Sequence, residues 1–259
     1  MMKKLGFERS AELNRNAIEM QFDVPFFLNF VFHPRPALLF GLATALATTI
    51  ISMALGILLG LLLCLCGRSK FWLLRNFNSA YVFAFRGTPL LVQVILIYFG
   101  VPYLTGVDLF PETVDLLGLV SLQGAIVAGI VAFALNEAAY ISEIARASIG
   151  SIDQGQWDAG KALGMRPALL MKLVILPQAV RVMLPPLGNQ VNGMFKATSL
   201  LYLIAVPEMM FIADAVNSVT FKTFEVYLGV SVYYLVITTA WSFVQKALER
   251  RYSKGVATL

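Results

Sequence analysis

The chain has 259 residues, of which 58% are hydrophobic and only 14% are charged, and its mean hydropathy is +0.75. A single soluble globule of this composition could not present a water-compatible surface, so most of the chain is expected to lie in lipid. The net charge of +5 comes from basic residues between apolar runs, where anionic lipid and the positive-inside bias explain them, and nucleic acid is therefore excluded as a partner.

The first 36 residues are expected to form an extracytoplasmic or interfacial tail. No apolar core follows Lys3 and Lys4, so this segment does not have the pattern of a signal peptide. Residues 22–32 are aromatic but too few to cross a bilayer, and they are expected to lie in the membrane interface. His33 is interpreted as an interfacial residue rather than a ligand.

Five stretches have the roughly 20 apolar residues that a membrane crossing requires. The first, residues 37–67, contains Gly56 and Gly60 as a GxxxG pair, which is interpreted as packing within the chain, with a dimer contact as the alternative. The other expected crossings are residues 87–107, residues 116–136 with a helical extension to 149, residues 187–206 interrupted by Lys196, and residues 226–245.

The charges of the loops predict the topology. Arg68, Lys70 and Arg75 follow the first crossing, whereas the loop after the second crossing is acidic, so the first loop is expected in the cytoplasm. The segment after the third crossing and the tail of residues 251–259 are also basic and expected inside. With five crossings in a membrane domain of residues 37–250, the N-terminus then lies outside.

A long cytoplasmic loop, residues 150–186, is rich in small residues and is expected to hold two short helices. The first would span residues 155–163 and end at Gly164, and the second would begin at Pro167, the usual places for a C-terminal glycine and an N-terminal proline. The small residues of the first helix would form a face that docks into another protein's groove. A solvated interfacial loop is the alternative.

One motif in this loop is misleading. Residues 155–161 fit the GxxxxGK part of a phosphate-binding loop, but Ala162 has no hydroxyl to hold magnesium, and a membrane helix precedes the motif instead of a strand. Nucleotide binding by this chain is therefore not expected, and an ATP-driven mechanism requires a separate ATPase chain.

The loop also carries a family resemblance. Residues 156–164 (QWDAGKALG) and 175–179 (ILPQA) resemble the EAA loop of ABC importer permeases, with Asp158 in place of glutamate and Gly160 in place of the second alanine. Segments 86–93, 139–146, 184–189 and 196–200 resemble the polar amino acid branch of these permeases. The chain is therefore identified, by resemblance, with the permease subunits of polar amino acid ABC importers.

This resemblance implies an all-α membrane protein of the type I importer architecture, with about five crossings and a cytoplasmic coupling loop. It implies a bacterial inner membrane location and, as partners, two ABC ATPase subunits, an identical or sister permease, an extracytoplasmic substrate-binding protein, the amino acid and lipid. ATP and magnesium would be bound by the ATPases, leaving no cofactor or metal in this chain. The implied coupling residues are Gln156, Asp158, Ala159, Gly160, Ala162, Gly164, Leu176 and Pro177.

Polar groups within the membrane are costly, so they are candidates for a substrate pathway. Glu137 is the leading candidate, because a carboxylate there could select a cationic amino acid; a structural pairing with Lys196 or Arg86 is the alternative. The remaining candidates, for which interhelical hydrogen bonds are the alternative, are Gln93, Asn136, Asn189 and Thr198.

Three other functional classes are alternatives to an importer subunit. A secondary transporter would need its driving force in this chain, typically with an internal repeat, and no repeat is visible. A membrane enzyme would need a catalytic constellation that one histidine and two cysteines of one helix do not provide. A channel remains open on hydropathy alone, and dependence of transport on a co-expressed ATPase would separate it from an importer.

Overall fold

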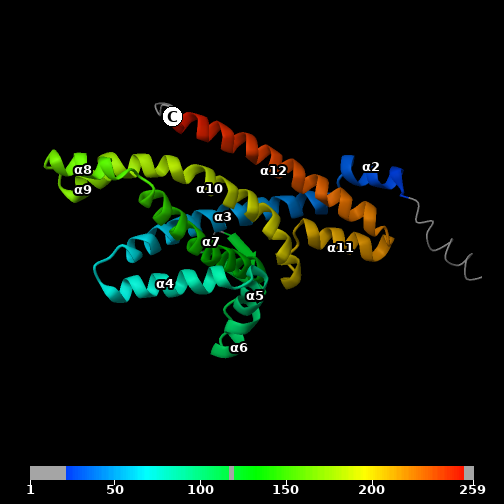
Figure 1. The fold of residues 1–259 in the computed structure, drawn as a ribbon. Coiled ribbons are helices and arrows are strands. Elements are labelled where there is room, and N and C mark those ends of the chain that lie inside the picture. The colour runs from blue at the N-terminus through cyan, green and yellow to red at the C-terminus, as the bar shows by residue number, and fades with distance from the viewer. Residues whose placement is uncertain (1–21, 117–119, 254–259) are drawn as a thin grey trace, which may run out of the picture.

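The computed structural model describes residues 22–116 and 120–253, which form long helices and one short pair of strands (Figure 1). Four helical stretches are long and apolar enough to cross a membrane: Pro36–Gly67, Gly124–Gly150, Pro167–Ile204 and Thr223–Tyr252. A bent helix pair adds a fifth crossing if it is counted as one span. The expected helical membrane fold with about five crossings is confirmed.

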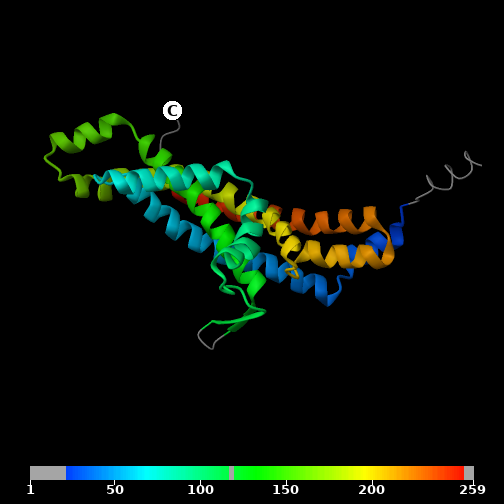
Figure 2. The same ribbon diagram turned by 90° about the horizontal axis from the view of Figure 1, so that it is seen from below.

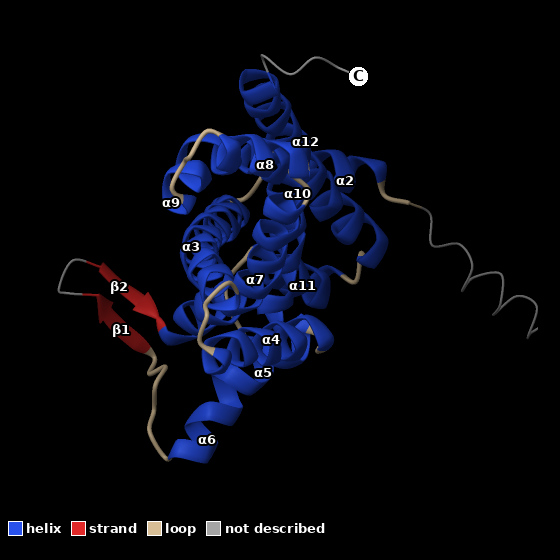
Figure 3. Cartoon of the chain, turned by 60° about the vertical axis from the view of Figure 1, so that its left-hand side comes forward, coloured by secondary structure: helices blue, strands red, loops and turns tan. Residues whose placement is uncertain are grey.

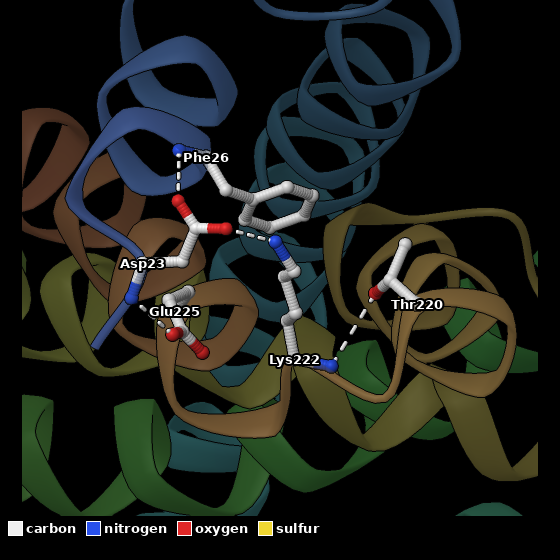
Figure 4. A network of polar contacts seen from close by, with 5 residues as sticks. All are labelled: Asp23, Phe26, Thr220, Lys222 and Glu225. Atoms are coloured by element: carbon white, nitrogen blue, oxygen red, sulfur yellow. Dashed lines mark hydrogen bonds and ion pairs between the residues drawn. The ribbon is translucent and has the colours of Figure 1, made fainter. Parts of the chain in front are cut away.

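The N-terminal helix α2 (Val24–Phe32) lies against the start of α12 (Thr223–Ser253), as Figure 4 shows in detail. The Asp23 carboxylate accepts a hydrogen bond from the Phe26 N–H at 2.9 Å and forms an ion pair with Lys222, and the Asp23 N–H donates to Glu225 Oε1 at 2.7 Å. The Lys222 ammonium and the Phe26 N–H lower the pKa of Asp23. Polar contacts therefore attach α2 to α12, while its depth in the membrane interface stays a prediction.

Removing the Lys222 charge should loosen α2. We expect Lys222→Met to speed amide hydrogen exchange of residues 22–32, with Lys246→Met as a control that removes a charge elsewhere on α12. Because the folded pKa of Asp23 is lowered, its ion pair stabilises the protein above the ordinary aspartate pKa, and this contribution is lost as the pH falls through the lowered value. Exchange that is unchanged in Lys222→Met would show that the ion pair is not needed and that the remaining contacts, among them the Asp23 N–H bond to Glu225, hold α2.

Helix α3 (Pro36–Gly67) packs along α7 (Gly124–Gly150) through its small residues. A Cβ atom added at Gly56 would lie 2.8 Å from the Glu137 Cβ, and one added at Gly60 would lie 2.8 Å from the Ala138 carbonyl oxygen. Real side chains do not approach this closely, so both glycines are needed for the two backbones to meet. The structure therefore supports the interpretation of this GxxxG pair as a contact within the chain.

The second expected crossing, residues 87–107, is not a straight span. Helix α4 (Trp72–Gly87) and the helical stretch Leu90–Thr105 meet at 106°. The stretch comprises α5 (Leu90–Ile95), a π-helical turn and α6 (Val101–Thr105). Thr88 is extended at φ −117° and ψ 147°, because a residue before proline disfavours the helical region, and Pro89 then starts α5.

The predicted start of the third crossing, residue 116, is too early. At that point the chain forms a hairpin of β1 (Thr113–Leu116) and β2 (Val120–Gln123), with Thr113 opposite Gln123 (Figure 3). Helix α7 starts only at Gly124, where a Cβ atom would overlap the backbone of the preceding loop. This close backbone approach marks the end of the hairpin and the start of the membrane helix.

The fourth expected crossing begins too late. Helix α9 (Pro167–Leu170) continues through a π-helical turn into α10 (Leu176–Ala197) and a 3₁₀ turn that ends at Ile204. The helix continues through Pro185 and Pro186. Helix α12 contacts this part of α10: Gln245 Nε2 donates to the Pro185 oxygen at 3.3 Å, and Trp241 Nε1 donates to the Gly188 oxygen at 2.8 Å.

Several segments gather at the two ends of the molecule (Figures 1 and 2). At one end lie α8 (Gln154–Ala162), α9 and the α3–α4 connection, whose basic residues predict the cytoplasm. At the other end lie α2 and the connection from α11 (Met209–Thr220) to α12. Helices α5 and α6 and the start of α7 lie between these two ends, and which end faces the cytoplasm stays a prediction.

Candidate coupling loop and substrate pathway

The first helix of the predicted coupling loop, α8, has well-defined ends. The Asp153 carboxylate accepts from the Gly155 N–H at 2.7 Å at the start. At the end, the Gly164 N–H donates to the Lys161 oxygen at 2.9 Å and the Met165 N–H to the Gly160 oxygen at 3.0 Å, the bonds of a Schellman motif. Gly164 has φ +69°, so the predicted helix end at this glycine is confirmed.

The expected small-residue face of α8 is divided between two sides of the helix. Gly160 is buried, because Leu170 of α9 lies where a Cβ atom of residue 160 would be. Ala159 and Ala162 are exposed, and Leu163 next to them is 80% exposed. Gly160 therefore holds α8 against α9, and the free surface of the loop includes Leu163, which the sequence reasoning missed although it directly precedes the helix-ending glycine.

Apolar contacts attach α8 and α9 to the membrane helices. Leu170 and Ile175 are buried in a cluster with Cys64 of α3 and Ile149 of α7, and Trp157 of α8 packs against this cluster. Polar contacts add to this attachment: Gln178 Nε2 of α10 donates to Gln156 Oε1 of α8 at 3.2 Å, while Leu176 and Pro177 remain exposed at the start of α10. The loop therefore forms one packed unit with the base of α3, α7 and α10.

Asp158 is an exposed acidic group on α8, with 62% of its side chain accessible. Its Oδ1 accepts from Gln154 Nε2 at 3.2 Å and from Lys161 Nζ at 3.3 Å, and these contacts lower the pKa of Asp158. Asp158 is therefore a carboxylate on the outer side of α8, adjacent to Ala159.

Two of the pathway candidates, Gln93 and Asn136, support the bend between α4 and α5. Gln93 Nε2 donates to the Phe85 oxygen and to Thr88 Oγ1, both at 2.8 Å. Asn136 Nδ2 of α7 donates to Gln93 Oε1 at 2.9 Å and to the Phe85 oxygen at 3.2 Å. The two amides satisfy backbone carbonyls that the break in the helix releases, which agrees with the alternative of interhelical hydrogen bonds.

Glu137 is buried between α3, α7 and α10, with 6% of its surface exposed. Gln190 Nε2 of α10 donates to Glu137 Oε2 at 3.1 Å. Within the part of the chain that the structure describes, neither Lys196 nor Arg86 forms an ion pair with Glu137, and the Arg86 guanidinium instead lies 5.3 Å from the Tyr140 ring centre. The alternative, a structural pairing of Glu137 with Lys196 or Arg86, is not formed within the described residues, and Gln190 contacts Glu137 instead.

The five pathway candidates do not converge on one point. Thr198 is fully buried and donates to the Phe195 oxygen at 2.8 Å, whereas Asn189 is exposed on α10. Gln93 and Asn136 contact each other, but Glu137 contacts α10 instead. In this structure Gln93 and Asn136 share one place on the membrane helices, and Glu137, Asn189 and Thr198 lie apart from it.

A buried carboxylate that the sequence reasoning missed is Glu208, which is inaccessible to solvent. Its Oε1 accepts from the Phe211 N–H at 2.8 Å, which caps α11, and its Oε2 accepts from the Tyr234 hydroxyl of α12 at 2.9 Å. Its backbone lies so close to Gly41 that a side chain there would collide. In the sequence, Glu208 could have been found as a carboxylate that directly follows a proline and precedes an apolar run.

Comparisons with known proteins agree with this architecture. The family model of the binding-protein-dependent transport system inner membrane component matches residues 53–254. The probable amino-acid permease protein YxeN of Bacillus subtilis is 38% identical over 76% of this chain and 82% of its own length. The octopine transport system permease protein OccM of Rhizobium radiobacter is also 38% identical, over 83% of this chain and 85% of its own.

A solved structure extends the similarity to three dimensions. A chain from the crystal structure of an amino acid ABC transporter with histidines is 36% identical and superimposes with a TM-score of 0.77, covering 87% of this chain and 98% of that one. The family match of residues 53–254 includes the coupling loop and all the membrane helices that follow α3. The chain therefore belongs to the family of binding-protein-dependent transport system inner membrane components.

Proposed function

We propose that this chain is the permease subunit of an ABC importer that carries a polar amino acid across the bacterial inner membrane. The observation that carries this proposal is a coupling-type loop, α8 and α9, packed on membrane helices and continuous with α10. Two relatives support an amino acid cargo through their names, YxeN and the transporter solved with histidines. ATP hydrolysis belongs to separate ATPase subunits, which would bind the ATP and magnesium.

The proposed complex contains two ATPase subunits, a second permease subunit that is identical or a sister chain, and an extracytoplasmic substrate-binding protein. The N-terminus would lie outside and the C-terminus in the cytoplasm, as the basic loops predict. Residues 1–21 of the proposed tail lie outside the described part of the chain. Membership of a binding-protein-dependent transport family supports these kinds of partner in general.

Coupling would act through the exposed side of α8. Asp158, Ala159, Ala162 and Leu163 would enter a groove of the ATPase, while Gly160 keeps α8 seated against Leu170. ATP binding closes the ATPase dimer, and the packed loop would move with it to exchange inward-open and outward-open states. This works only if the two states differ in their affinity for ATPase and substrate, because a ligand shifts an equilibrium only by that difference.

Glu137 would contribute selectivity for a cationic amino acid. Its carboxylate is covered by Gln190 in this structure, so we propose that substrate access requires α10 to move relative to α7. A charged group this deep in a membrane protein is costly, and such groups commonly mark transport pathways. Helix α10, which contacts Glu137 and continues from the coupling loop, would then connect the selective carboxylate with that loop.

The test is uptake by the reconstituted complex of permease, ATPase and binding protein, offered histidine, arginine, lysine, glutamine and glutamate. We expect uptake that depends on ATP; uptake without it would indicate a channel or a secondary transporter. Glu137→Gln keeps an acceptor for Gln190 but removes the charge, and it should reduce the preference for cationic over neutral amino acids about tenfold, since hydrogen bonds to charged groups contribute about 1.5 to 3 kcal/mol.

The matched control is Glu143→Gln, which removes a carboxylate from the same helix where it pairs with Arg146. This variant should leave the preference among amino acids unchanged. If Glu137→Gln also leaves the preference unchanged while the complex still imports amino acids, the selectivity role of Glu137 is wrong and its contact with Gln190 serves packing.

A further inference from the structure

A turn with two prolines joins α2 to α3 and carries two basic side chains. His33 and Arg35 each precede a proline, which disfavours the helical region for the residue before it. Their backbones are accordingly non-helical, at φ −124° and ψ 65° for His33 and at φ −63° and ψ 147° for Arg35. The Arg35 oxygen accepts from the Leu38 N–H at 2.9 Å. The turn therefore presents two exposed basic groups from a constrained backbone.

Both basic side chains border a pocket of about 60 Å³ between α2, α3 and α11. Asn29 also lines it, and its other lining residues are apolar: Phe26, Phe30, Leu38, Ile212 and Val216. Leu38 is only 2% exposed, whereas His33 and Arg35 are exposed, so the basic groups lie at the mouth of the pocket. The Tyr233 hydroxyl of α12 donates to the Val31 oxygen at 2.6 Å, which holds this end of α2 in place.

The turn lies at the depth of the lipid headgroups. Helix α3 has 32 residues and is about 48 Å long at about 1.5 Å per residue, whereas the hydrocarbon core of a bilayer is about 30 Å thick. Arg35 and Arg68 flank this charge-free helix, so each of them reaches a headgroup layer. Exposed apolar side chains lie next to Arg35 in the sequence, Phe32, Leu39 and Phe40. The pocket is therefore at the boundary between phosphate groups and acyl chains.

The chemistry of the pocket suits a phosphate that carries an apolar chain. A guanidinium donates two parallel hydrogen bonds to phosphate oxygens, and an imidazole N–H can donate another. The volume is far below the range of about 300 to 1,000 Å³ for sites that enclose a whole small molecule. The pocket can therefore take one apolar segment of a ligand whose remainder lies outside it, as the acyl chain of a phospholipid would.

We propose that the pocket at the α2–α3 turn binds an anionic phospholipid. Its phosphate contacts Arg35 and His33, and the first part of an acyl chain lies against the apolar residues of the pocket. The positive charge of Arg35 favours a lipid with a net negative charge over a zwitterionic one. Helix α2 and the turn precede residue 53, where the family match begins, so this site goes beyond the proposed transport function. The lipid would join α2, α3 and α11 at one end of the molecule.

The test places the permease–ATPase complex in phosphatidylcholine nanodiscs with a trace of photoreactive lipid, either phosphatidylglycerol or phosphatidylcholine with a diazirine near the glycerol. Mass spectrometry then locates the labelled peptides. We expect phosphatidylglycerol to label residues 26–38 and 212–216 about fivefold more than phosphatidylcholine, which corresponds to the contribution of one basic residue near a membrane surface. Equal labelling by the two lipids would overturn the proposal.

Three variants test the two parts of the site. Arg35→Gln should abolish the preference for phosphatidylglycerol, whereas Arg35→Lys keeps the charge and should keep most of the preference. Val216→Phe fills the pocket without a change in charge and should reduce labelling by both lipids. Lys246→Gln is the control, because it removes an exposed charge near the other end of α12, and it should be labelled as the wild type is. Labelling that persists unchanged in both Arg35→Gln and Val216→Phe would contradict the site.

Other occupants of the pocket would give different results. If inorganic phosphate abolishes the labelling and potassium chloride of equal ionic strength does not, the basic pair binds a free anion and the proposal is wrong. Deletion of residues 1–21, which include Glu8, Glu12 and Glu19, should leave the labelling unchanged. Labelling that appears only after this deletion would show that the chain's own tail fills the pocket. Absence of labelling from both chains would show that another polypeptide covers it, and either result would overturn the proposal.

Discussion

Gly164→Val should uncouple transport from ATP hydrolysis while the protein still reaches the membrane. Gly164 has φ +69°, a conformation that costs a β-branched residue about 1 to 2 kcal/mol, which is a factor of about 5 to 30 in the population of the correctly folded turn. The turn fixes α8 against α9 through two backbone hydrogen bonds. We therefore expect substrate-stimulated ATPase activity of the reconstituted complex to fall by a similar factor.

Gly150→Val is the control for this prediction. Gly150 ends α7 in the same region, has no positive φ, and has nothing within 4 Å of an added Cβ atom. An added Cβ atom at Gly164 also meets nothing within 4 Å, so the two variants differ mainly in backbone strain. Normal substrate stimulation of the ATPase activity in the reconstituted Gly164→Val complex would contradict the assigned role of the turn. An equal loss of this activity in Gly150→Val would show that the effect comes from the added bulk or from β-branching.

Gln93→Leu should lower the stability of the membrane domain at the bend between α4 and α5. The change leaves the Thr88 oxygen without the Gln93 amide and leaves Asn136 without its acceptor on Gln93, while the Phe85 oxygen keeps only its bond from Asn136. A buried polar group without a partner costs about 1 to 3 kcal/mol. We expect the thermal midpoint of the detergent-solubilised complex to fall by several degrees, at about 2 to 4 °C per kcal/mol.

Gln154→Leu is the corresponding control, because Gln154 is exposed and its bond to Asp158 lies in water. It should change the thermal midpoint little. The double variant Gln93→Leu with Asn136→Leu removes the amide that the single change leaves unpaired, so it should cost less than two independent losses. A wild-type midpoint in Gln93→Leu would show that the Gln93 amide is not needed and that Pro89, apolar packing and the Asn136 bond to Phe85 maintain the bend.

Features that depend on neighbouring residues were predictable from the sequence. The end of α8 at Gly164 and the start of α9 at Pro167 follow from the backbone preferences of glycine and proline. The charge-free stretch of residues 37–67 lies entirely within α3, because lipid requires continuous apolar surface and internal hydrogen bonding.

Features that depend on contacts between distant segments could not be predicted in this way. The expected loop extended to residue 186, but α10 already begins at Leu176, and Gln245 and Trp241 of α12 contact it near Pro185 and Gly188. The amide of Gln190, 53 positions away from Glu137, likewise contacts the Glu137 carboxylate, where the alternative interpretation placed Lys196 or Arg86. Such partners are set by the packing of helices, which apolar periodicity does not specify.

The unbroken path from α9 through α10 has a mechanical consequence. Pro167 lies about 28 Å before the pair of contacts that Gln245 and Trp241 make with α10, and Lys196 lies about 12 to 16 Å beyond them, at about 1.5 Å per residue. If α9 and α10 tilt as one rigid body about these contacts, their two ends move in opposite directions. A displacement of the Pro167 end by the ATPase would therefore move the Lys196 end the opposite way, by about half as much.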